Sequence, residues 1–166
     1  MDEAGDVSIG IPTMSDLEAL VELWSQLVTS QRVYGSDLDP AINREAARRH
    51  LMGLLVEEGI RVAVVTDAFV GFTTFSLQRD AFERSEQVGI IENLYVEPAY
   101  RGLGIGTRLL DHAEKALEAR GATLARLEVL PANTAAQSFY RDRGYRPERL
   151  RFEKPVETDT SNSEGP

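Results

Sequence analysis

Apolar residues recur at helical or alternating spacing through most of the chain, and this spacing predicts where the elements lie. In the first half, Leu17, Leu20, Val21 and Trp24 follow helical spacing after a short apolar run. Two later runs are rich in β-branched and aromatic residues and flank a short turn, which is typical of a hairpin. The expected order is a strand at 7–11, helices at 17–28 and 41–57, and hairpin strands at 61–66 and 70–77.

The second half alternates between strand and helix patterns, separated by turns that contain glycine or proline. The expected order is a strand at 88–96, a helix at 104–120, a strand at 123–130, a helix at 134–143 and a last strand at 145–153. This order predicts one mixed α/β domain over residues 1–155. Residues 156–166 are polar with little apolar content, so we expect a disordered tail there.

Composition and charge exclude several classes of protein. The chain has no cysteine and only 2 histidines, so no metal site, disulfide or thiolate chemistry is expected. The formal net charge of −9 disfavours a nucleic-acid partner, and it suits either a cationic small substrate or simple solubility. No apolar run approaches the roughly 20 residues of a membrane span, and the acidic N-terminus is unlike a secretory signal. We therefore expect no membrane partner and a cytoplasmic location.

A glycine-rich turn, Arg101-Gly102-Leu103-Gly104-Ile105-Gly106-Thr107, separates the strand at 88–96 from the next helix. Residues without side chains let the backbone curl so that successive amides point inward, and the start of a helix adds partial positive charge. Arg101 and Thr107 can add a guanidinium and a hydroxyl group. The turn is therefore predicted to bind a diphosphate; the alternative is a tight turn whose glycines serve only packing.

Spacing separates this turn from two other phosphate-binding loops. A P-loop ends in Gly-Lys followed by Ser or Thr, whereas this turn ends in Gly106-Thr107-Arg108. The dinucleotide fingerprint would need a glycine where Thr107 stands, and it normally opens a domain. A diphosphate-bearing cofactor other than a nucleoside triphosphate or NAD is therefore favoured.

The turn also resembles a family signature. Arg101-x-x-Gly104-x-Gly106 is similar to the Arg/Gln-x-x-Gly-x-Gly/Ala motif of the GCN5-related N-acetyltransferase (GNAT) superfamily. Its neighbours match that family too, in order: Ile91-Glu92-Asn93-Leu94-Tyr95-Val96 before it, and Asn133 and Phe139-Tyr140-x-x-x-Gly144-Tyr145 after it. The resemblance implies a splayed mixed sheet of about six or seven strands flanked by about four helices, and acetyl-CoA as the acetyl donor.

The resemblance also implies where acetyl-CoA binds. The pantetheine arm would pair with the backbone of 94–96 like an extra strand, and the diphosphate would lie on the amides of 101–107. For Asn133, a helix N-cap is already a sufficient structural reason. The implied cofactor-binding residues are Leu94, Tyr95, Val96, Arg101, Gly102, Leu103, Gly104, Ile105, Gly106, Thr107, Asn133 and Tyr140.

Acetyl transfer from a thioester to an amine needs a base for the amine and an acid for the departing thiolate. Glu92 is at every-second-residue spacing with Ile90, Leu94 and Val96, so the four side chains are expected on the same face of the strand. On this apolar face the carboxylate suits a base that acts directly or through water. The alternative is a solvated carboxylate at a strand end, or one paired to an arginine. The polyamine acetyltransferase branch of the superfamily uses a glutamate at the position that matches Glu92.

Glu128 and Tyr140 are the other catalytic candidates. Glu128 interrupts an apolar run, and ribosomal-protein N-terminal acetyltransferases of this superfamily use a glutamate on the corresponding strand as base; a structural carboxylate is the alternative. Tyr140 follows Asn133 by about two helical turns, and the family places this hydroxyl near the CoA sulfur as general acid. A phenol, with an ordinary pKa of about 10, suits that role. The alternative for Tyr140 is a core aromatic.

On the acceptor side the candidates are Tyr34, Phe75 and Glu92, because acids beside aromatics suit a cation. The favoured function is transfer of an acetyl group from acetyl-CoA to a primary amine of a small cationic metabolite. The alternatives are a protein N-terminal or lysine acetyltransferase with Glu128 as base, and a non-catalytic acetyl-CoA-binding module. Many relatives in the superfamily are dimers, so a homodimer is compatible with the resemblance.

Overall fold

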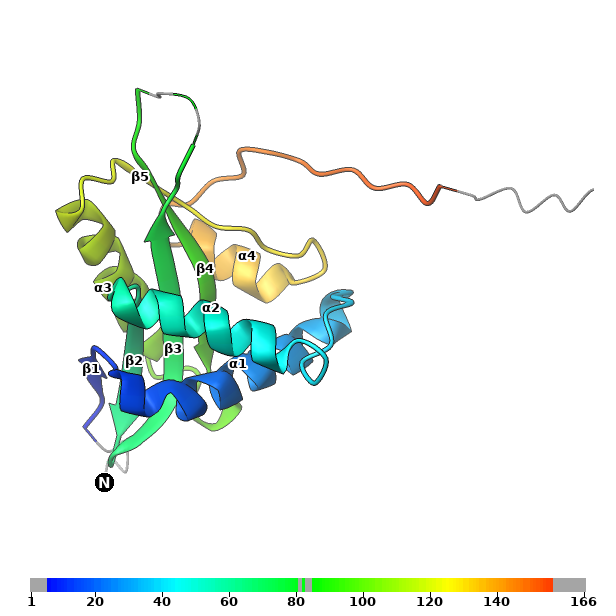
Figure 1. The fold of residues 1–166 in the computed structure, drawn as a ribbon. Helices are drawn as coiled ribbons and strands as arrows, with labels where there is room; N and C mark the ends of the chain where they lie inside the picture. The colour runs from blue at the N-terminus through cyan, green and yellow to red at the C-terminus, as the bar shows by residue number, and fades with distance from the viewer. Residues whose placement is uncertain (1–5, 81, 83–84, 157–166) are drawn as a thin grey trace, which may run out of the picture. The chain divides into compact units, whose positions relative to one another are not determined.

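The computed structural model describes residues 6–80, 82 and 85–156, which fall into two compact units, Met1–Ala132 and Asn133–Pro166 (Figure 1). The strands are β1 (Ser8–Gly10), β2 (Ile60–Val65), β3 (Ala68–Leu77), β4 (Val88–Val96) and β5 (Leu124–Arg126). The α-helices are α1 (Leu17–Gln31), α2 (Arg44–Val56), α3 (Ile105–Ala119) and α4 (Thr134–Arg141). The first unit holds all these elements except α4, and the single domain expected over 1–155 stays a prediction.

The first unit is built on one mixed sheet in the order β1-β2-β3-β4-β5. Each neighbouring pair from β1 to β4 is antiparallel, and β4 pairs with β5 in parallel. A parallel connection needs a crossover, which α3 supplies between β4 and β5. The fold class is therefore mixed α/β, as expected from the order of the sequence patterns.

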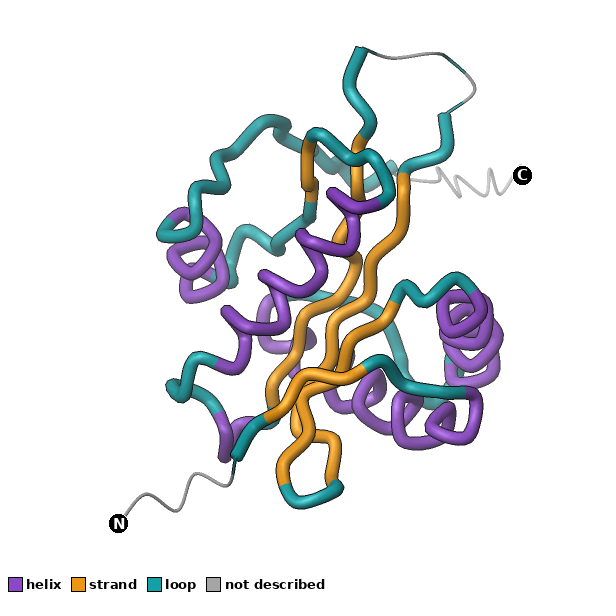
Figure 2. The backbone as a smooth tube through the Cα atoms, turned by 90° about the vertical axis from the view of Figure 1, so that its left-hand side faces the viewer, coloured by secondary structure: helices purple, strands orange, loops and turns teal. Residues whose placement is uncertain are grey.

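Helices cover both faces of this sheet (Figure 2). On one face α1 and α2 pack through a buried cluster that contains Leu20, Leu51 and Phe72. On the other face α3 packs through Ile105 and Leu109 against β2 and β3. The apolar stripes that predict these helices are the faces that they bury, because a helix gains most of its stability from such packing.

The strands of the second half differ from the expectation. The described residues form five strands, fewer than the six or seven implied by the resemblance. The strand expected at 123–130 is short, since β5 ends at Arg126, and the strand expected at 145–153 does not form. Alternating apolar residues are not sufficient for a strand, because a strand also needs a neighbour to complete its hydrogen bonds. Of the tail expected at 156–166, residues 157–166 lie outside the described part of the chain.

Candidate functional site

A bulge in β4 positions Glu92. In the ladder with β3, Thr74 pairs with Asn93 and Phe75 with Ile91, so Glu92 is the extra residue on β4. A bulge leaves one residue unpaired and bends its strand, and such bulges are frequent beside functional sites. The register therefore singles out Glu92 among the residues of β4.

The bulge also decides which face Glu92 occupies. Leu94 and Val96 pack on the α3 side with Ile105, whereas the Glu92 carboxylate contacts His50 of α2. The sequence expectation that Glu92 shares a face with Leu94 and Val96 is therefore wrong. One extra residue reverses the alternation of side chains between the faces of a strand, and its position depends on the partner strand.

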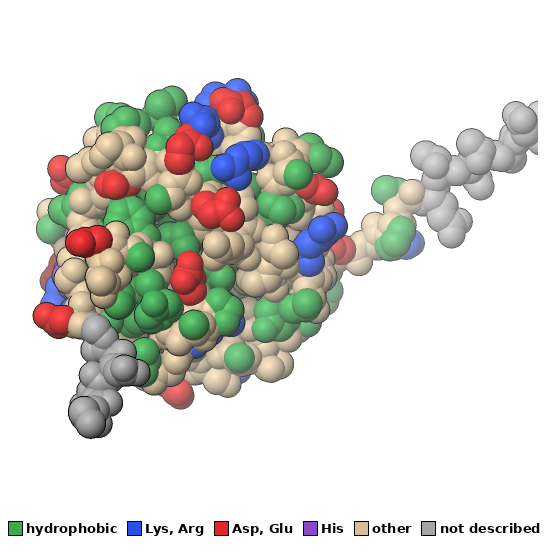
Figure 3. All heavy atoms as spheres, turned by 90° about the horizontal axis from the view of Figure 1, so that it is seen from below, with side chains coloured by type: hydrophobic (Ala, Val, Ile, Leu, Met, Phe, Trp, Pro, Cys, Tyr) green, Lys and Arg blue, Asp and Glu red, His purple; other side chains and the backbone are tan. Residues whose placement is uncertain are grey.

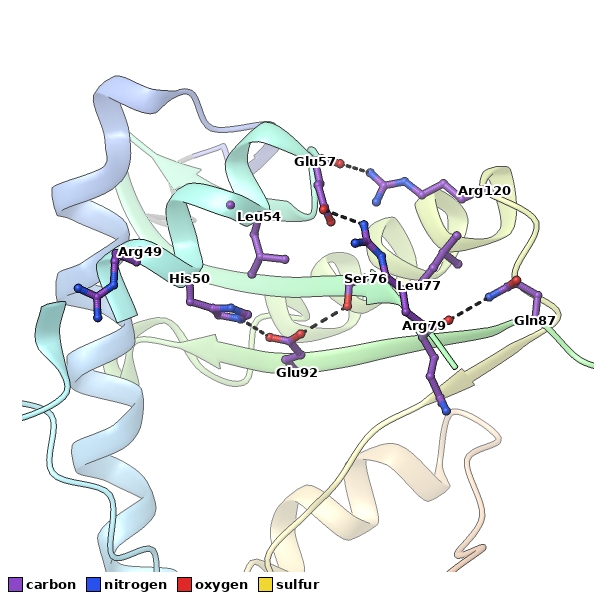
Figure 4. A pocket seen from close by; sticks show the side chains of 12 residues that line it. Arg49, His50, Leu54, Glu57, Ser76, Leu77, Arg79, Gln87, Glu92 and Arg120 are labelled. Atoms are coloured by element: carbon purple, nitrogen blue, oxygen red, sulfur yellow. Dashed lines mark hydrogen bonds and ion pairs between the residues drawn. The ribbon is translucent and has the colours of Figure 1, made fainter. Parts of the chain in front are cut away.

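Glu92 opens into a pocket of about 720 Å³ beside α2 and the ends of β3 and β4 (Figure 4). This volume lies within the range of sites that hold small molecules. The lining residues are Arg49, His50, Gly53, Leu54, Glu57, Ser76, Leu77, Gln78, Arg79, Gln87, Glu92 and Arg120. Nine of these twelve residues are polar or charged, and all twelve belong to the first unit.

The Glu92 carboxylate is held by two side chains. Its Oε2 lies 2.6 Å from Nε2 of His50, and Oγ of Ser76 donates to its Oε1 at 3.4 Å. The Glu92 side chain is 29% exposed and the His50 side chain 55% exposed. Figure 4 shows the Glu92 carboxylate pointing toward both partners. A carboxylate oriented in this way and open to a pocket can accept a proton, and the exposed imidazole can exchange one with solvent.

Along the edge of β4 that faces β5, only the first three residues of β4 pair with a strand among the described residues. β5 pairs with Val88 to Ile90 only, so in the described part of the chain β4 from Ile91 to Val96 has no strand neighbour on that side. Such an edge presents main-chain N–H and C=O groups that an extended ligand can pair with. The segment 94–96, which the resemblance implies for pantetheine, lies on this edge.

The turn at 101–107 leads from β4 into α3. Gly102 and Gly104 have φ of +79° and +78°, a conformation that L side chains rarely adopt, and Gly104 is the N-cap residue of α3. The hydrogen-bond ladder of α3 starts with the amide of Arg108 donating to the carbonyl of Gly104. The amides of Ile105 and Gly106 precede that first bond, so they point out of the helix start and suit an anion.

Arg101 ties this turn to the end of β4. Its Nε donates to the carbonyl oxygen of Val96 at 2.8 Å, and its guanidinium lies 5.6 Å from the ring centroid of Tyr95. Tyr95 itself is buried, and this burial raises the pKa of its phenol. Arg101 thus holds a positive charge between the free edge of β4 and the glycine turn.

The second unit carries the remaining two candidates. Asn133 is the N-cap residue of α4, and its Oδ1 accepts from the amide of Ala136 at 3.1 Å. Tyr140 lies on α4 with its ring 5.2 Å from that of Phe139 and 5.7 Å from that of Tyr145. Burial raises the pKa of Tyr140 to about 12, so its hydroxyl stays protonated at neutral pH. Asn133 therefore has the capping role expected for it, and Tyr140 has the protonation state of an acid.

The other candidates lie outside the pocket. Glu128 is exposed and follows β5 in a segment without regular structure. Phe75 is fully buried, with the guanidinium groups of Arg61 and Arg120 over its ring at 5.2 and 5.4 Å. Tyr34 ends a short 3-10 helix and is partly buried. None of these three lines the pocket that Glu92 opens into.

His50 is one of the site residues that sequence reasoning missed. It lies three residues after Ala47 and four before Leu54, both buried, so helical spacing could have placed it at the border of the sheet-facing side of α2. Its contact with Glu92 joins residues 42 positions apart. That pairing depends on how α2 crosses β4, which no local pattern contains.

The described residues hold neither a candidate metal cluster nor a candidate membrane span. They contain no group of three or more His, Cys, Asp or Glu side chains placed to hold a metal ion. None of their helices is both long enough and apolar enough to cross a membrane.

Comparison with known sequences gives the family. The model of the acetyltransferase (GNAT) family matches residues 20–145. An uncharacterized N-acetyltransferase of Archaeoglobus fulgidus is 36% identical over 85 residues, which cover 51% of this chain and 57% of that protein. The aminoalkylphosphonate N-acetyltransferase of Salmonella typhimurium is 32% identical over 96 residues, which cover 58% of this chain and 62% of that protein. The chain thus spans about half the length of the relatives it matches.

Comparison with solved structures agrees with the family match. An aminoglycoside N-acetyltransferase in complex with CoA superposes with a TM-score of 0.75 over 93% of this chain and 98% of that one. At 19% sequence identity this likeness shows the fold alone. The family model covers more than half of the sequence and includes the β4 segment, the glycine turn and Tyr140. The chain therefore belongs to the acetyltransferase (GNAT) family.

Proposed function

We propose that this protein transfers the acetyl group of acetyl-CoA to the primary amine of a small metabolite. The observation that carries the proposal is the position of Glu92. It lies at a bulge in β4, opens into a pocket of about 720 Å³, and is two residues from the edge at 94–96, which has no strand neighbour on that side among the described residues. A base, a pocket for an acceptor and an edge for a donor therefore meet at one strand.

The residues of the first unit fit acetyl-CoA. The edge at 94–96 suits an extended amide-containing arm, and the amides of Ile105 and Gly106 suit a diphosphate. Arg101 adds positive charge at the start of the turn. When bound, acetyl-CoA supplies the acetyl group as a thioester.

Glu92 and Tyr140 are the proposed proton-transfer residues. The amine nitrogen forms a bond to the acetyl carbon as the bond from that carbon to sulfur breaks. Glu92 takes the proton that the amine loses, and the hydroxyl of Tyr140 gives a proton to the departing sulfur. His50 holds the Glu92 carboxylate and, being exposed, can pass the proton on to solvent. The raised pKa of Tyr140, at about 12, keeps this hydroxyl protonated at neutral pH before the transfer.

A small acceptor is favoured over a protein. The pocket has the volume of a small-molecule site, and Glu128, the base proposed for the protein-directed alternative, lies outside its lining. The Salmonella relative is named for an aminoalkylphosphonate, which is a small amine. These observations support a soluble amine metabolite as the acceptor.

The test is a screen for thiol release from acetyl-CoA with grouped amines, including diamines, amino acids, aminophosphonates, aminoglycosides and N-terminal peptides. We expect turnover with a small amine, and Glu92→Gln and Tyr140→Phe should each lower kcat by about 10²-fold or more. Glu45→Gln is the matched control, since Glu45 lies on the first turn of α2 outside the pocket. Full activity in both variants would overturn the assigned roles, and acetyl-CoA binding by calorimetry without any turnover would favour the non-catalytic module.

A further inference from the structure

The charge of the pocket is opposite to the charge of the chain. The whole sequence has 27 acidic and 18 basic side chains, but the pocket is lined by three arginines, one histidine and two glutamates. The arginines come from three different places: Arg49 from α2, Arg79 from the segment after β3, and Arg120 from the end of α3. A site that binds only cations would be expected to have the reverse balance.

The acidic surplus of the chain lies elsewhere. On the face drawn in Figure 3, acidic side chains are spread over the surface, some of them beside Lys or Arg, and are not gathered into a patch. Scattered surface charge of one sign serves solubility. The net charge of −9 therefore does not predict a cationic acceptor, and the pocket itself is the better guide.

Both glutamates of the pocket already have partners. Glu92 contacts His50, and Oε1 of Glu57 lies 3.1 Å from Nη2 of Arg79. The side chains of Arg79 and Glu57 are 86% and 50% exposed, so their ion pair is weak and a ligand can exchange with it. Across the described residues, no carboxylate lies within ion-pair distance of Arg49 or Arg120.

Arg120 combines a fixed position with an uncompensated charge. Its Nη2 donates to the carbonyl oxygens of Glu57 and Glu58 at 2.9 and 3.1 Å, and its guanidinium lies over the Phe75 ring. Carbonyl oxygens orient a guanidinium without cancelling its charge, and three of its five N–H donors remain for a ligand. The Arg120 charge also affects a neighbouring arginine: burial, and after it the charge of Arg120, lowers the pKa of Arg61.

The two ends of the pocket therefore differ. Figure 4 shows Glu92 and His50 toward one end, with Arg49 beyond His50, and Glu57, Arg79 and Arg120 at the other, with Leu54 between the two groups. A carboxylate at one end suits an amine, and two guanidinium groups at the other suit an acid, since arginine binds carboxylates and phosphonates through paired hydrogen bonds. A diamine would place its second ammonium group against these arginines.

We infer that the acceptor is an amine that also carries an acidic group, a carboxylate, phosphonate or phosphate, which binds Arg120 and Arg79 while the amine faces Glu92. This inference rests on the proposed acetyl transfer and specifies its acceptor. It replaces the cationic metabolite expected from the sequence with a zwitterionic one.

The test compares four acceptors that share a three-carbon chain: propylamine, 1,3-diaminopropane, β-alanine and 3-aminopropylphosphonate. We expect kcat/KM to be at least about tenfold higher for an acid-bearing amine than for the other two, a difference of ~1.4 kcal/mol. Arg79→Gln and Arg120→Gln should raise KM for the acid-bearing amines much more than for propylamine, and so remove this preference. Arg44→Gln is the control, since Arg44 lies on α2 outside the pocket, near Glu18 and Glu22.

A second measurement separates this inference from the proposed function. Propylphosphonate, which has no amine, should raise the Tm of the wild type, and this increase should shrink in Arg79→Gln, which removes no contact to the main chain. If propylphosphonate binds in this way but no amine is acetylated, the proposed function fails and the anion site stands. The inference would be overturned by a higher kcat/KM for 1,3-diaminopropane than for the acid-bearing amines. It would also be overturned if both variants lowered kcat/KM equally for propylamine and for the acid-bearing amines.

Discussion

Alanine at Gly104 tests whether the glycine turn binds a diphosphate through its backbone. Gly104 has a φ of +78°, and a Cβ added there would meet nothing within 4 Å. The cost of the substitution is therefore conformational and not steric. An L residue in this left-handed region costs about 1–2 kcal/mol, so alanine must either bear that strain or turn the amides that follow it.

Gly121 supplies a matched control at the other end of the same helix. It has a φ of +92°, also with nothing within 4 Å of an added Cβ, and its amide donates to the carbonyl of Glu118. The helix between the two glycines, Ile105–Ala119, has 15 residues, which places Gly121 about 22 Å or more from the turn. Gly121→Ala therefore has a similar strain without disturbing the proposed diphosphate site.

We expect both variants to lower the free energy of unfolding by about 1–2 kcal/mol, and hence Tm by about 2–8 °C for a domain of this size. Only Gly104→Ala should also weaken CoA, by about tenfold in Kd, since charge-assisted hydrogen bonds to the amides contribute about 1.5–3 kcal/mol. Thermal unfolding and calorimetric titration with CoA measure the two effects. Equal CoA affinity in the two variants would refute the backbone site, and an unchanged Tm in both would refute the strain.

Three further predictions each concern a single residue. His50→Ala should lower kcat roughly tenfold, less than loss of the base itself, and added imidazole should restore part of it; loss without rescue would mean that His50 acts only in packing. Tyr140 should titrate near pH 12 in the ultraviolet difference between wild type and Tyr140→Phe. Because its pKa is raised on folding, Tyr140 should stabilise the fold below about pH 10 and lose that effect as the pH rises to about 12; ionisation near pH 10 would contradict its burial. Gly89→Ala would place a Cβ 2.6 Å from Cδ1 of Leu117 and should lower the free energy of unfolding, measured in urea, by about 1–3 kcal/mol. In a Leu117→Ala background the same substitution should lower it by less, because the contact is gone. If the losses of the two single variants simply add in the double variant, this contact is not the cause.

Local sequence patterns correctly predicted the elements whose boundaries depend on residues nearby in the sequence. β4 runs from Val88 to Val96, as expected from its β-branched and apolar run, and α3 lies within one residue of the helix expected at 104–120. Glycines explain the two ends of α3, because Gly104 and Gly121 both take a positive φ that stops regular helix. The glycine turn and its position between a strand and a helix were equally readable from the sequence.

Patterns that depend on a partner strand were less reliable. The apolar runs at 123–130 and 145–153 resemble strands, but only Leu124–Arg126 forms one. Pairing with β4 stops at Ile90, two residues before the bulge at Glu92 that bends the strand. Whether an alternating run becomes a strand thus depends on an edge that other parts of the chain must supply.

By itself, the sequence determined the family, and it predicted the order of most elements and the position of the glycine turn, because these follow from short-range spacing. The tertiary structure alone decided which face Glu92 occupies, that His50 reaches it from α2, and that Arg79 and Arg120 meet at the far end of one pocket. These contacts join residues tens of positions apart, and they depend on a bulge and on how a helix crosses a sheet. The charge that an acceptor meets is set by such long-range contacts, so the net charge of the chain could not predict it.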